Sequence, residues 1–196
     1  MKKTLITIIA TVLVCCCVAG ATYAWLVDKT TPITNTFTFG DINITLTETK
    51  GEAVAGKDNT MSFKAVPGAT IAKDPKVTVA ANSEACWLFV KITETNNKLG
   101  AEQIINYSVR DPWQKVNGTD NVYYIKVDSV PAEGYYVFTG AGDNANGFVT
   151  VNNKITKENL QTLASNVPTI TVTAYAVQQE GFATAEAAWA EAEKLG

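Results

Sequence analysis

The sequence predicts an all-β fold, a jelly-roll-like β-sandwich with one or two short helices, preceded by a hydrophobic signal-peptide helix. Thr, Val, Ile, Tyr and Phe, the residue types that favour strands, are frequent after the first 24 residues. Turn signals such as Pro-Gly, Asn-Gly and Asn-Asn separate the apolar runs at short spacing. Many short strands divided in this way favour a sandwich over alternating β and α units.

Individual strands are indicated by apolar and polar residues that alternate with a period of two. Residues 86–92 are instead almost continuously apolar, which is typical of a strand buried on both faces. Two helices are expected, at residues 157–165 with Thr156 as the N-cap and at residues 184–195, which are rich in Ala and Glu. The other expected strands are residues 36–39, 42–47, 77–79, 122–127, 135–138 and 170–177.

The first residues have the three-part pattern of a secretory signal peptide. Lys2 and Lys3 precede an uncharged apolar run over residues 5–21, and small residues follow that run. We therefore expect a signal peptide at residues 1–24 and one β-sandwich domain at residues 25–196. An uncleaved membrane anchor is the alternative, because the apolar run is close to the shortest that spans a bilayer.

The cleavage site is predicted from the small residues after the apolar run. Signal peptidase accepts small side chains at −1 and −3, so a cut after Ala24 places Thr22 at −3 and starts the mature chain at Trp25. A cut after Ala21 is a second option. Removing residues 1–24 leaves 14 basic and 19 acidic residues, a net charge of −5. This acidic balance argues against nucleic acid as a partner.

Cysteine use argues against a disulfide-stabilised domain. Three of the four cysteines lie in the signal peptide, and only Cys86 remains in the mature chain, within an apolar run where we expect a buried, inert thiol. A lipoprotein signal is disfavoured because Val14, the residue before the first cysteine, is not small.

The sequence offers few groups for catalysis, and no enzyme activity, cofactor or metal is expected. The chain has no histidine, which excludes Ser-His-Asp and Cys-His nucleophile pairs and the HExxH zinc motif. Residues 143–147 resemble part of a calcium-binding loop, but Ala145 and Gly147 stand at positions where such a loop needs oxygen ligands. A turn is therefore the preferred interpretation. Four carboxylates could be imagined as a glycosidase pair, but we expect them to lie on a solvated strand face. Seven aromatic residues could line a ligand groove, but we expect them to pack in the core. The carboxylates are Asp28, Asp41, Glu48 and Glu52, and the aromatics are Trp87, Phe89, Tyr123, Tyr124, Tyr135, Tyr136 and Tyr175.

Three blocks of sequence resemble one known family. The first reads GATYAWLVD at residues 20–28 and NTFTFGDINITLTE at residues 35–48, the second contains VPG and KDPKV between residues 66 and 77, and the third covers residues 172–189. In this order they are similar to the TasA/camelysin (CalY) family of exported Gram-positive proteins, which a SipW-type signal peptidase processes. Residues 95–165 match no motif of the family. The matching motif residues are Asp28, Asn35, Phe37, Gly40, Glu48, Pro67, Gly68, Lys73, Pro75 and Val77.

The resemblance implies a secreted structural protein, a biofilm-matrix fibre subunit or cell-surface subunit with a jelly-roll sandwich. In the fibres of that family the mature N-terminal segment adds as a strand to the next subunit, which is itself or a paralogous subunit. Here the donor would lie within residues 25–35, with Trp25, Leu26, Val27 and Ile33 as buried anchors. Signal peptidase would then be a partner during export. The alternative is a monomeric or membrane-tethered surface adhesin or binding module.

Some members of the family have been called metalloproteases. This chain departs from that activity because it has neither histidine nor any recognised zinc motif. No catalytic residue is therefore carried over from the family.

Overall fold

The computed structural model describes residues 3, 4, 6, 9, 10, 35, 40–129 and 134–195. The chain divides into two units, Met1–Thr38 and Phe39–Gly196, and every described strand lies in the second. All of the expected signal peptide except residues 3, 4, 6, 9 and 10 lies outside the described residues, and so do the cleavage site, strand 36–39, Trp25, Leu26, Val27, Asp28, Ile33 and Phe37. In the part that is described, no helix has the length and apolar character needed to cross a membrane.

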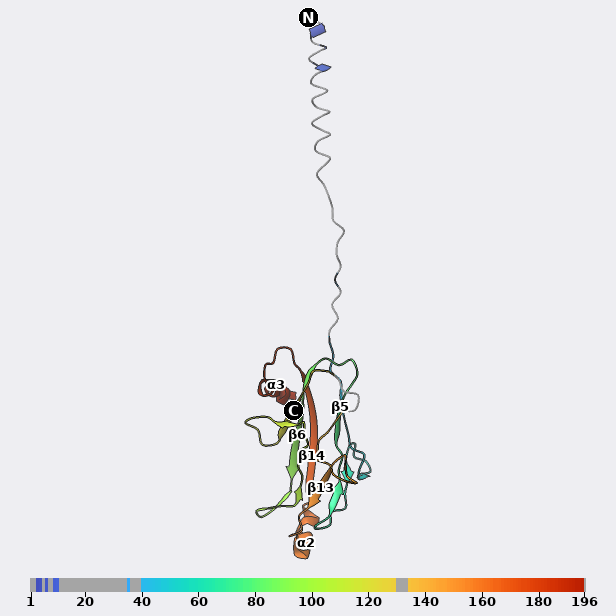
Figure 1. Cartoon of the computed structure of the whole chain (residues 1–196), viewed down its shortest axis with the longest axis vertical. Helices are drawn as coiled ribbons and strands as arrows, with labels where there is room; N and C mark the ends of the chain where they lie inside the picture. The colour runs from blue at the N-terminus through green and yellow to red at the C-terminus, as the bar shows by residue number, and fades with distance from the viewer. Residues whose placement is uncertain are drawn as a thin grey trace. The chain divides into compact units, whose positions relative to one another are not determined.

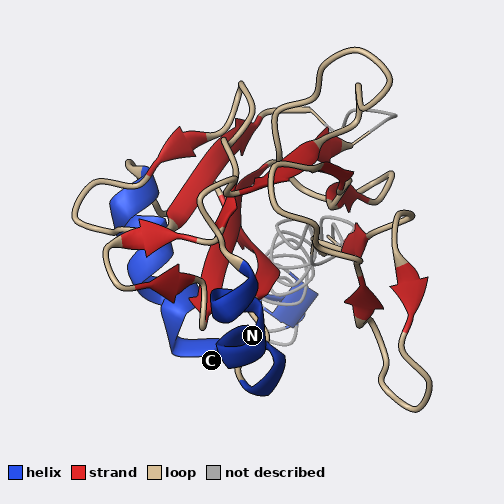
Figure 2. Ribbon diagram, turned by 90° about the horizontal axis from the view of Figure 1, so that it is seen from below, coloured by secondary structure: helices blue, strands red, loops and turns tan. Residues whose placement is uncertain are grey.

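The second unit is built of antiparallel strands and two short helices, which confirms the all-β class (Figures 1 and 2). Its largest sheet has the order β10 (Gln114–Lys115), β11 (Val122–Val127), β6 (Cys86–Thr95) and β14 (Thr169–Gln178). A second sheet has the order β1 (Ile44–Thr47), β5 (Lys76–Val79) and β12 (Tyr135–Tyr136). The third has the order β4 (Thr70–Ala72), β13 (Phe148–Val151) and β9 (Ile105–Asn106).

Two small hairpins and two helices complete the unit. The hairpins pair β2 (Glu52–Ala53) with β3 (Met61–Ser62), and β7 (Lys98–Leu99) with β8 (Glu102–Gln103). The helices are α2 (Lys157–Ser165) and α3 (Ala185–Ala192), and the 3₁₀ turn η2 (Glu193–Leu195) follows α3. Figure 1 shows α2 and α3 at opposite ends of the sheets.

Both helices begin where the sequence predicts. The Thr156 side chain accepts a hydrogen bond from the backbone N–H of Asn159, and the Asn159 side chain accepts one from the Thr156 backbone, so the first turn has a capping box. Thr184 caps α3 in the same way, through the N–H of Ala187.

Strand β6 is longer than predicted because Thr93, Glu94 and Thr95 continue its pairing with β14. The short strands β2, β3, β4, β7, β8, β9, β10 and β13 were not predicted. Most have only two or three residues, too few to display a period of two.

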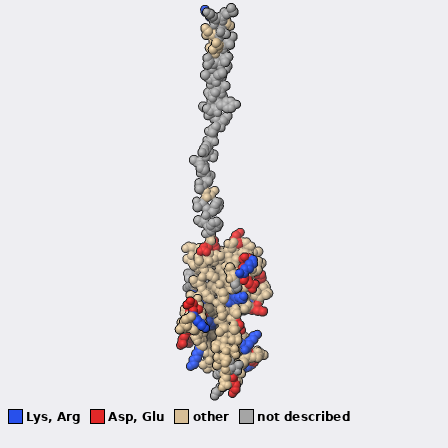
Figure 3. Space-filling model, turned by 180° about the vertical axis from the view of Figure 1, so that it is seen from behind, with Lys and Arg blue, Asp and Glu red and all other residues tan. Residues whose placement is uncertain are grey.

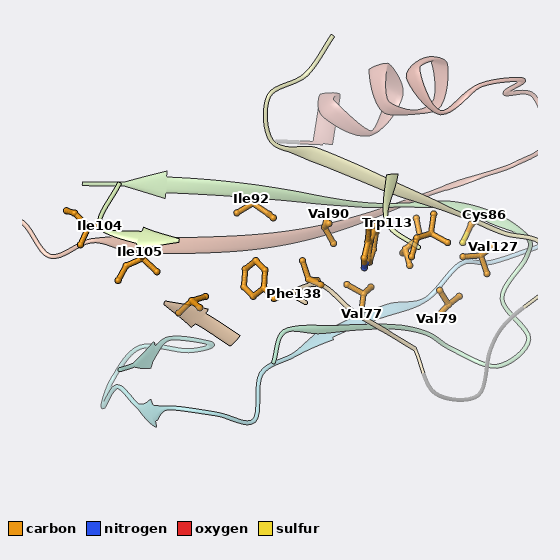
Figure 4. Close-up of a cluster of buried hydrophobic side chains, with 14 of the residues drawn as sticks. Val77, Val79, Cys86, Val90, Ile92, Ile104, Ile105, Trp113, Val127 and Phe138 are labelled. Atoms are coloured by element: carbon orange, nitrogen blue, oxygen red, sulfur yellow. The ribbon is translucent and has the colours of Figure 1, made fainter. Parts of the chain in front are cut away.

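Strand β6 separates two hydrophobic cores, as its apolar sequence predicts. Leu88, Val90 and Ile92 face the first core, between the large sheet and the strands opposite it. Figure 4 shows Val90 and Ile92 on one side of this core, with Val77, Val79 and Phe138 facing them. Trp87 and Phe89 face the second core, on the other side of the large sheet. Adjacent residues of β6 therefore point to opposite faces, and both faces are buried.

Helix α3 covers the second core. Trp189 is only 5% exposed, and its ring lies 5.4 Å from the ring of Phe89 and 5.3 Å from that of Tyr175. These are the separations at which tilted and edge-to-face aromatic pairs attract. The predicted aromatics of β6, β11 and β14 thus pack in the two cores, and Tyr123 and Tyr124 point one to each.

The expectation that Cys86 is a buried thiol is confirmed. Its side chain is fully buried in the first core, and burial raises its pKa to about 11. A thiol with so high a pKa stays protonated at neutral pH and is a poor nucleophile.

Replacing Trp189 with alanine is predicted to lower the free energy of unfolding by about 3–4 kcal/mol, because it removes a buried aromatic and leaves a cavity. Urea denaturation followed by circular dichroism measures this change. The matched control is Glu191→Ala on the exposed side of the same helix, with an expected change within about 0.5 kcal/mol. Equal effects of the two substitutions would show that α3 does not stabilise the fold through Trp189.

Candidate functional site

Strands β14 and β1 each lie at the end of a sheet and have one unpaired edge, and both are longer than the other end strands β4, β9, β10 and β12, which have two or three residues. In the part of the chain that the structure describes, β14 pairs only with β6, and β1 pairs only with β5. An unpaired edge presents backbone N–H and C=O groups that another strand can bind. These two edges are the candidate functional site.

The register shows which residues of β14 present their backbone outward. The N–H of Gln179 donates to the carbonyl of Ala85, directly opposite, at 3.0 Å. Odd-numbered residues of β14 therefore bond to β6, because directly opposed residues alternate between bonded and non-bonded pairs. The even-numbered residues direct their N–H and C=O away from β6: Ile170, Val172, Ala174, Ala176 and Gln178.

The same reasoning applies to β1. The N–H of Ala80 donates to the carbonyl of Asn43 at 2.7 Å, so the odd-numbered residues of β1 bond to β5. Ile44 and Leu46 direct their backbone groups away from β5. The outward edge of β1 is thus much shorter than that of β14.

The edges of β1 and β14 lie close together, with Cα atoms of the two strands within 8 Å. A strand placed between them and hydrogen-bonded to both would need them roughly 9.5 Å apart, since paired strands are spaced at about 4.8 Å. An added strand can therefore pair with only one edge at these positions. The longer edge, on β14, is the better acceptor. We call the backbone edge of β14 at residues 170–178, together with the adjoining β1, the open seam.

Apolar side chains of the open seam face the first core without being fully buried. Ile44 lies opposite Val79, and Leu46 lies opposite Val77, so both share the core face of β5. Leu46 is nevertheless 38% exposed. The core-facing residues of β14 are likewise only partly buried: Ile170, Val172, Ala174 and Ala176. The first core is therefore incompletely covered along β1 and β14.

Strand β14 also lacks the features by which sheet edges usually avoid pairing with other chains. Its sequence, TITVTAYAVQ, contains no charged residue and no proline. Charged side chains, prolines and very short edge strands are the common protections, and β14 has ten residues. An edge of this length and composition is suited to accept a strand.

A partly buried group of charges holds the end of β1 beside the open seam. Lys73 Nζ lies 2.7 Å from Glu48 Oε2, and both side chains are about one-seventh exposed or less. The other oxygen of Glu48 accepts a hydrogen bond from the backbone N–H of Asp74 at 2.7 Å. We call Glu48, Lys73 and Asp74 the ionic clasp. It ties the residue after β1 to the connection between β4 and β5.

Asp74 completes the clasp through Thr49 and Lys50. Its carboxylate accepts hydrogen bonds from the backbone N–H of Thr49 at 2.9 Å, from the Thr49 hydroxyl at 2.5 Å and from the backbone N–H of Lys50 at 3.0 Å. Burial acts to raise the pKa of Asp74, but these hydrogen bonds outweigh it and lower the pKa. For Glu48, burial outweighs the attraction of Lys73 and raises the pKa.

The structure brings the first two sequence blocks together at the clasp. Glu48 comes from the first block and Lys73 from the second, and Pro75 and Val77 follow in the same segment. The carbonyl of Pro75 accepts a hydrogen bond from the N–H of Val137 at 2.9 Å, and Val77 is fully buried in the first core. These motif residues therefore hold β1 and β5 in place.

Two motif glycines, Gly40 and Gly68, form no part of the clasp. A Cβ on Gly40 would come within 2.4 Å of the Glu84 side chain, which explains the small residue there. Gly68 has a φ of 78°, which favours glycine after Pro67, and its N–H donates to the carbonyl of Val151 at 3.0 Å. Asn35 is exposed and belongs to no strand.

The described carboxylates of the glycosidase alternative have different surroundings. Glu48 belongs to the clasp, the Asp41 side chain accepts hydrogen bonds from Asn43 and Ile42, and Glu52 is exposed in β2. Residues 143–147 form turns, and the carbonyl of Ala145 accepts a hydrogen bond from Arg110. Among the residues described, no group of three or more His, Cys, Asp or Glu side chains is placed to hold a metal ion.

Charged side chains of both signs are interspersed on the face drawn in Figure 3. Basic residues on this face therefore do not form the continuous patch or stripe that is typical of a nucleic-acid-binding surface.

Sequence reasoning missed two features of the site. Asp74 enters the sequence analysis only within the KDPKV motif, and nothing in that motif indicates that its carboxylate accepts hydrogen bonds from Thr49 and Lys50. Residues 170–177 were predicted as a strand, but whether the edge of that strand is unpaired depends on which strands lie beside it, and the local sequence does not contain that information.

Comparison with protein-family models, with curated proteins and with solved structures finds no match for this chain. Its function must therefore be inferred from its own residues and geometry.

Replacing Lys73 with methionine is predicted to lower the free energy of unfolding by about 3 kcal/mol, because Glu48 would keep a partly buried charge without its partner. Adding Glu48→Gln is predicted to recover part of that loss, since the amide removes the charge. Chemical denaturation of Lys73→Met, of Glu48→Gln and of the double variant gives the interaction free energy between Lys73 and Glu48.

The matched control for the clasp is Lys154→Met. Lys154 lies at the same 2.7 Å from Glu102, but both side chains are about half exposed or more, so a loss below about 1 kcal/mol is expected. If Lys73→Met and Lys154→Met cost the same, burial does not distinguish the two ion pairs and the clasp has no special role in stability.

Replacing Asp74 with asparagine is predicted to lower stability by about 1–3 kcal/mol at pH 7, because an amide cannot accept the same set of hydrogen bonds. The lowered pKa of Asp74 stabilises the fold above its ordinary pKa of 3.8, and this contribution disappears as the pH falls through the lower folded-state pKa. The difference between the natural protein and the variant should therefore narrow below pH 4. Denaturation at several pH values tests this, and a constant difference would contradict it.

Proposed function

We propose that this chain is an exported structural protein, a subunit of a biofilm-matrix fibre or of a cell-surface assembly, whose jelly-roll-like sandwich accepts a β-strand from a neighbouring subunit. The observation that supports it best is the open seam. Strand β14 has ten uncharged residues, pairs on one side only and leaves core-facing apolar side chains partly exposed. A strand added there would bind the outward backbone groups and cover those side chains.

The strand to be donated is residues 25–35 of a neighbouring copy or of a paralogous subunit. This segment contains the apolar residues Trp25, Leu26, Val27 and Ile33. Because a signal peptide over residues 1–24 would precede it, signal peptidase would free its N-terminus during export. A head-to-tail contact that does not close on itself produces a filament.

A structural role agrees with how the polar groups of the sandwich are used. Glu94 accepts hydrogen bonds from Asn97, Gln103 and Tyr107, and the clasp is likewise satisfied internally. Every buried side-chain nitrogen and oxygen among the described residues has a hydrogen-bond partner. Groups bound in this way position strands, and the proposal assigns them no catalytic step, cofactor or metal.

The mature protein, residues 25–196, is predicted to form filaments that are visible by negative-stain electron microscopy. The same protein without residues 25–35 is predicted to stay monomeric, because it lacks the strand that fills the seam of its neighbour. Size-exclusion chromatography and circular dichroism check that the shortened protein is folded.

Two results would contradict the proposal. Filaments formed by the shortened protein would show that residues 25–35 are not the donated strand. Folded monomers of both proteins, even when mixed at high concentration, would favour a surface adhesin or binding module that works alone or tethered to the membrane.

A further inference from the structure

The core-facing side chains of β14 change in size along the open seam. Ile170 and Val172 are branched, whereas Ala174 and Ala176 are the smallest side chains that a strand residue other than glycine has. The alanines lie opposite Val90 and Leu88 of β6, both fully buried, so they face the first core. Although they face the core, Ala174 and Ala176 are only partly buried. The seam therefore has a section lined by methyl groups.

An added strand would place alternate side chains into this section. The backbone groups of Ala174 and Ala176 point outward, so residues paired with them lie on the same face and point toward the core. The Cβ atoms of directly opposite residues on neighbouring strands are about 5 Å apart, so their two side chains share the space on that face of the sheet. Because alanine fills less of the space shared by two facing side chains than isoleucine or valine does, large side chains pair better with Ala174 and Ala176 than with Ile170 and Val172.

We infer that Ala174 and Ala176 form a specificity notch, which selects incoming strands that carry two large apolar side chains at positions i and i+2. The occupant is the N-terminal segment of a second copy of this chain, with Trp25 and Val27 in the notch. This inference rests on the proposed function and deepens it, because it names the residues that determine which strand is accepted.

Trp25 and Val27 fit the notch by their spacing and character. They are two residues apart and both apolar, so they point to the same face of an extended segment, while Leu26 between them points to the other. Either orientation of the incoming strand keeps this alternation.

The segment is also long enough to reach a neighbour. Residues 25–39 precede the described part of the sandwich, and if extended they span roughly 50 Å at 3.3 Å per residue. Asp41 and Asn43 already hydrogen-bond to the loop before β6, through Glu84 at 3.0 Å and Ser83 at 3.1 Å, which fixes the start of β1. Only the residues before them are available for donation.

The first test fills the notch from within. In the mature protein Ala176→Leu and Ala174→Leu are predicted to slow filament growth at least tenfold, measured by light scattering and electron microscopy. The control is Thr171→Leu, which adds a similar apolar side chain to the exposed outer face of the same strand and should leave growth within twofold. Thermal denaturation of each variant identifies any that has lost its fold.

The second test does not depend on filling the notch. Two mature proteins, one carrying Trp25→Cys and the other Ala176→Cys, are mixed and oxidised. A disulfide-linked dimer is expected, with at least a tenfold higher yield than from Trp25→Cys mixed with Thr171→Cys, whose side chain points to the opposite face. Cys86 is fully buried and does not compete.

The outcomes separate this inference from the proposed function. Filaments that grow at the natural rate in both alanine variants, with equal cross-linking at residues 171 and 176, would overturn the notch and leave strand donation standing. A natural protein that forms no filaments, with no cross-linked dimer from either mixture, would overturn both, because no chain would then donate its N-terminal segment to a neighbour.

Discussion

The fold depends on the hydrogen-bonding of one strand. The odd-numbered residues of β6 bond to β14, and its even-numbered residues up to Ile92 bond to β11 or to Asn121 just before it, so residues 86–92 are paired on both sides. The same alternation sends its side chains to two faces, and each face needs an apolar cover. The strands opposite the large sheet cover one face, and α3 covers part of the other with Trp189. The register also makes the core-facing residues of β14 those that present their backbone outward. The site is thus a consequence of how β6 is paired.

The magnitudes indicate which part of the open seam would control binding. A backbone hydrogen bond that replaces bonds to water contributes about 1 kcal/mol, and β14 presents five outward residues. Association of two proteins costs on the order of 4–15 kcal/mol in lost freedom of motion. Backbone pairing alone therefore roughly balances this cost. Apolar side chains buried in the seam contribute the surplus, about 1.5–3 kcal/mol for each large one. Selectivity then lies with side chains, although the geometry of strand addition comes from the backbone.

The sequence predicted the long elements well and the site only in part. Strands β6, β11 and β14 and both helix starts have strong local signals, which are an apolar run, strict alternation and threonine caps. The short strands have no such signal, because two or three residues are held by their neighbours rather than by their own pattern. The ionic clasp joins Glu48 to Lys73, and neither residue indicates its partner, since 25 positions of chain separate them. Likewise, the alternation of residues 170–177 predicts a strand and a buried face, but not whether a further strand lies beside it.

The clasp explains how an open edge can persist beside a second unpaired edge. Strand β1 has four residues and lies within pairing reach of β14, so a small shift would let the two edges bond and close the seam. A register shift by two residues would keep the same face buried, and the apolar pattern alone would not prevent it. The contacts of Glu48 with Lys73 and with the N–H of Asp74 exist in one register only. Partly buried ion pairs add little net stability compared with apolar residues, but they penalise arrangements that leave a charge unpaired. On this view the charges at the end of β1 are retained because they hold the strand in the position that keeps the edge of β14 accessible.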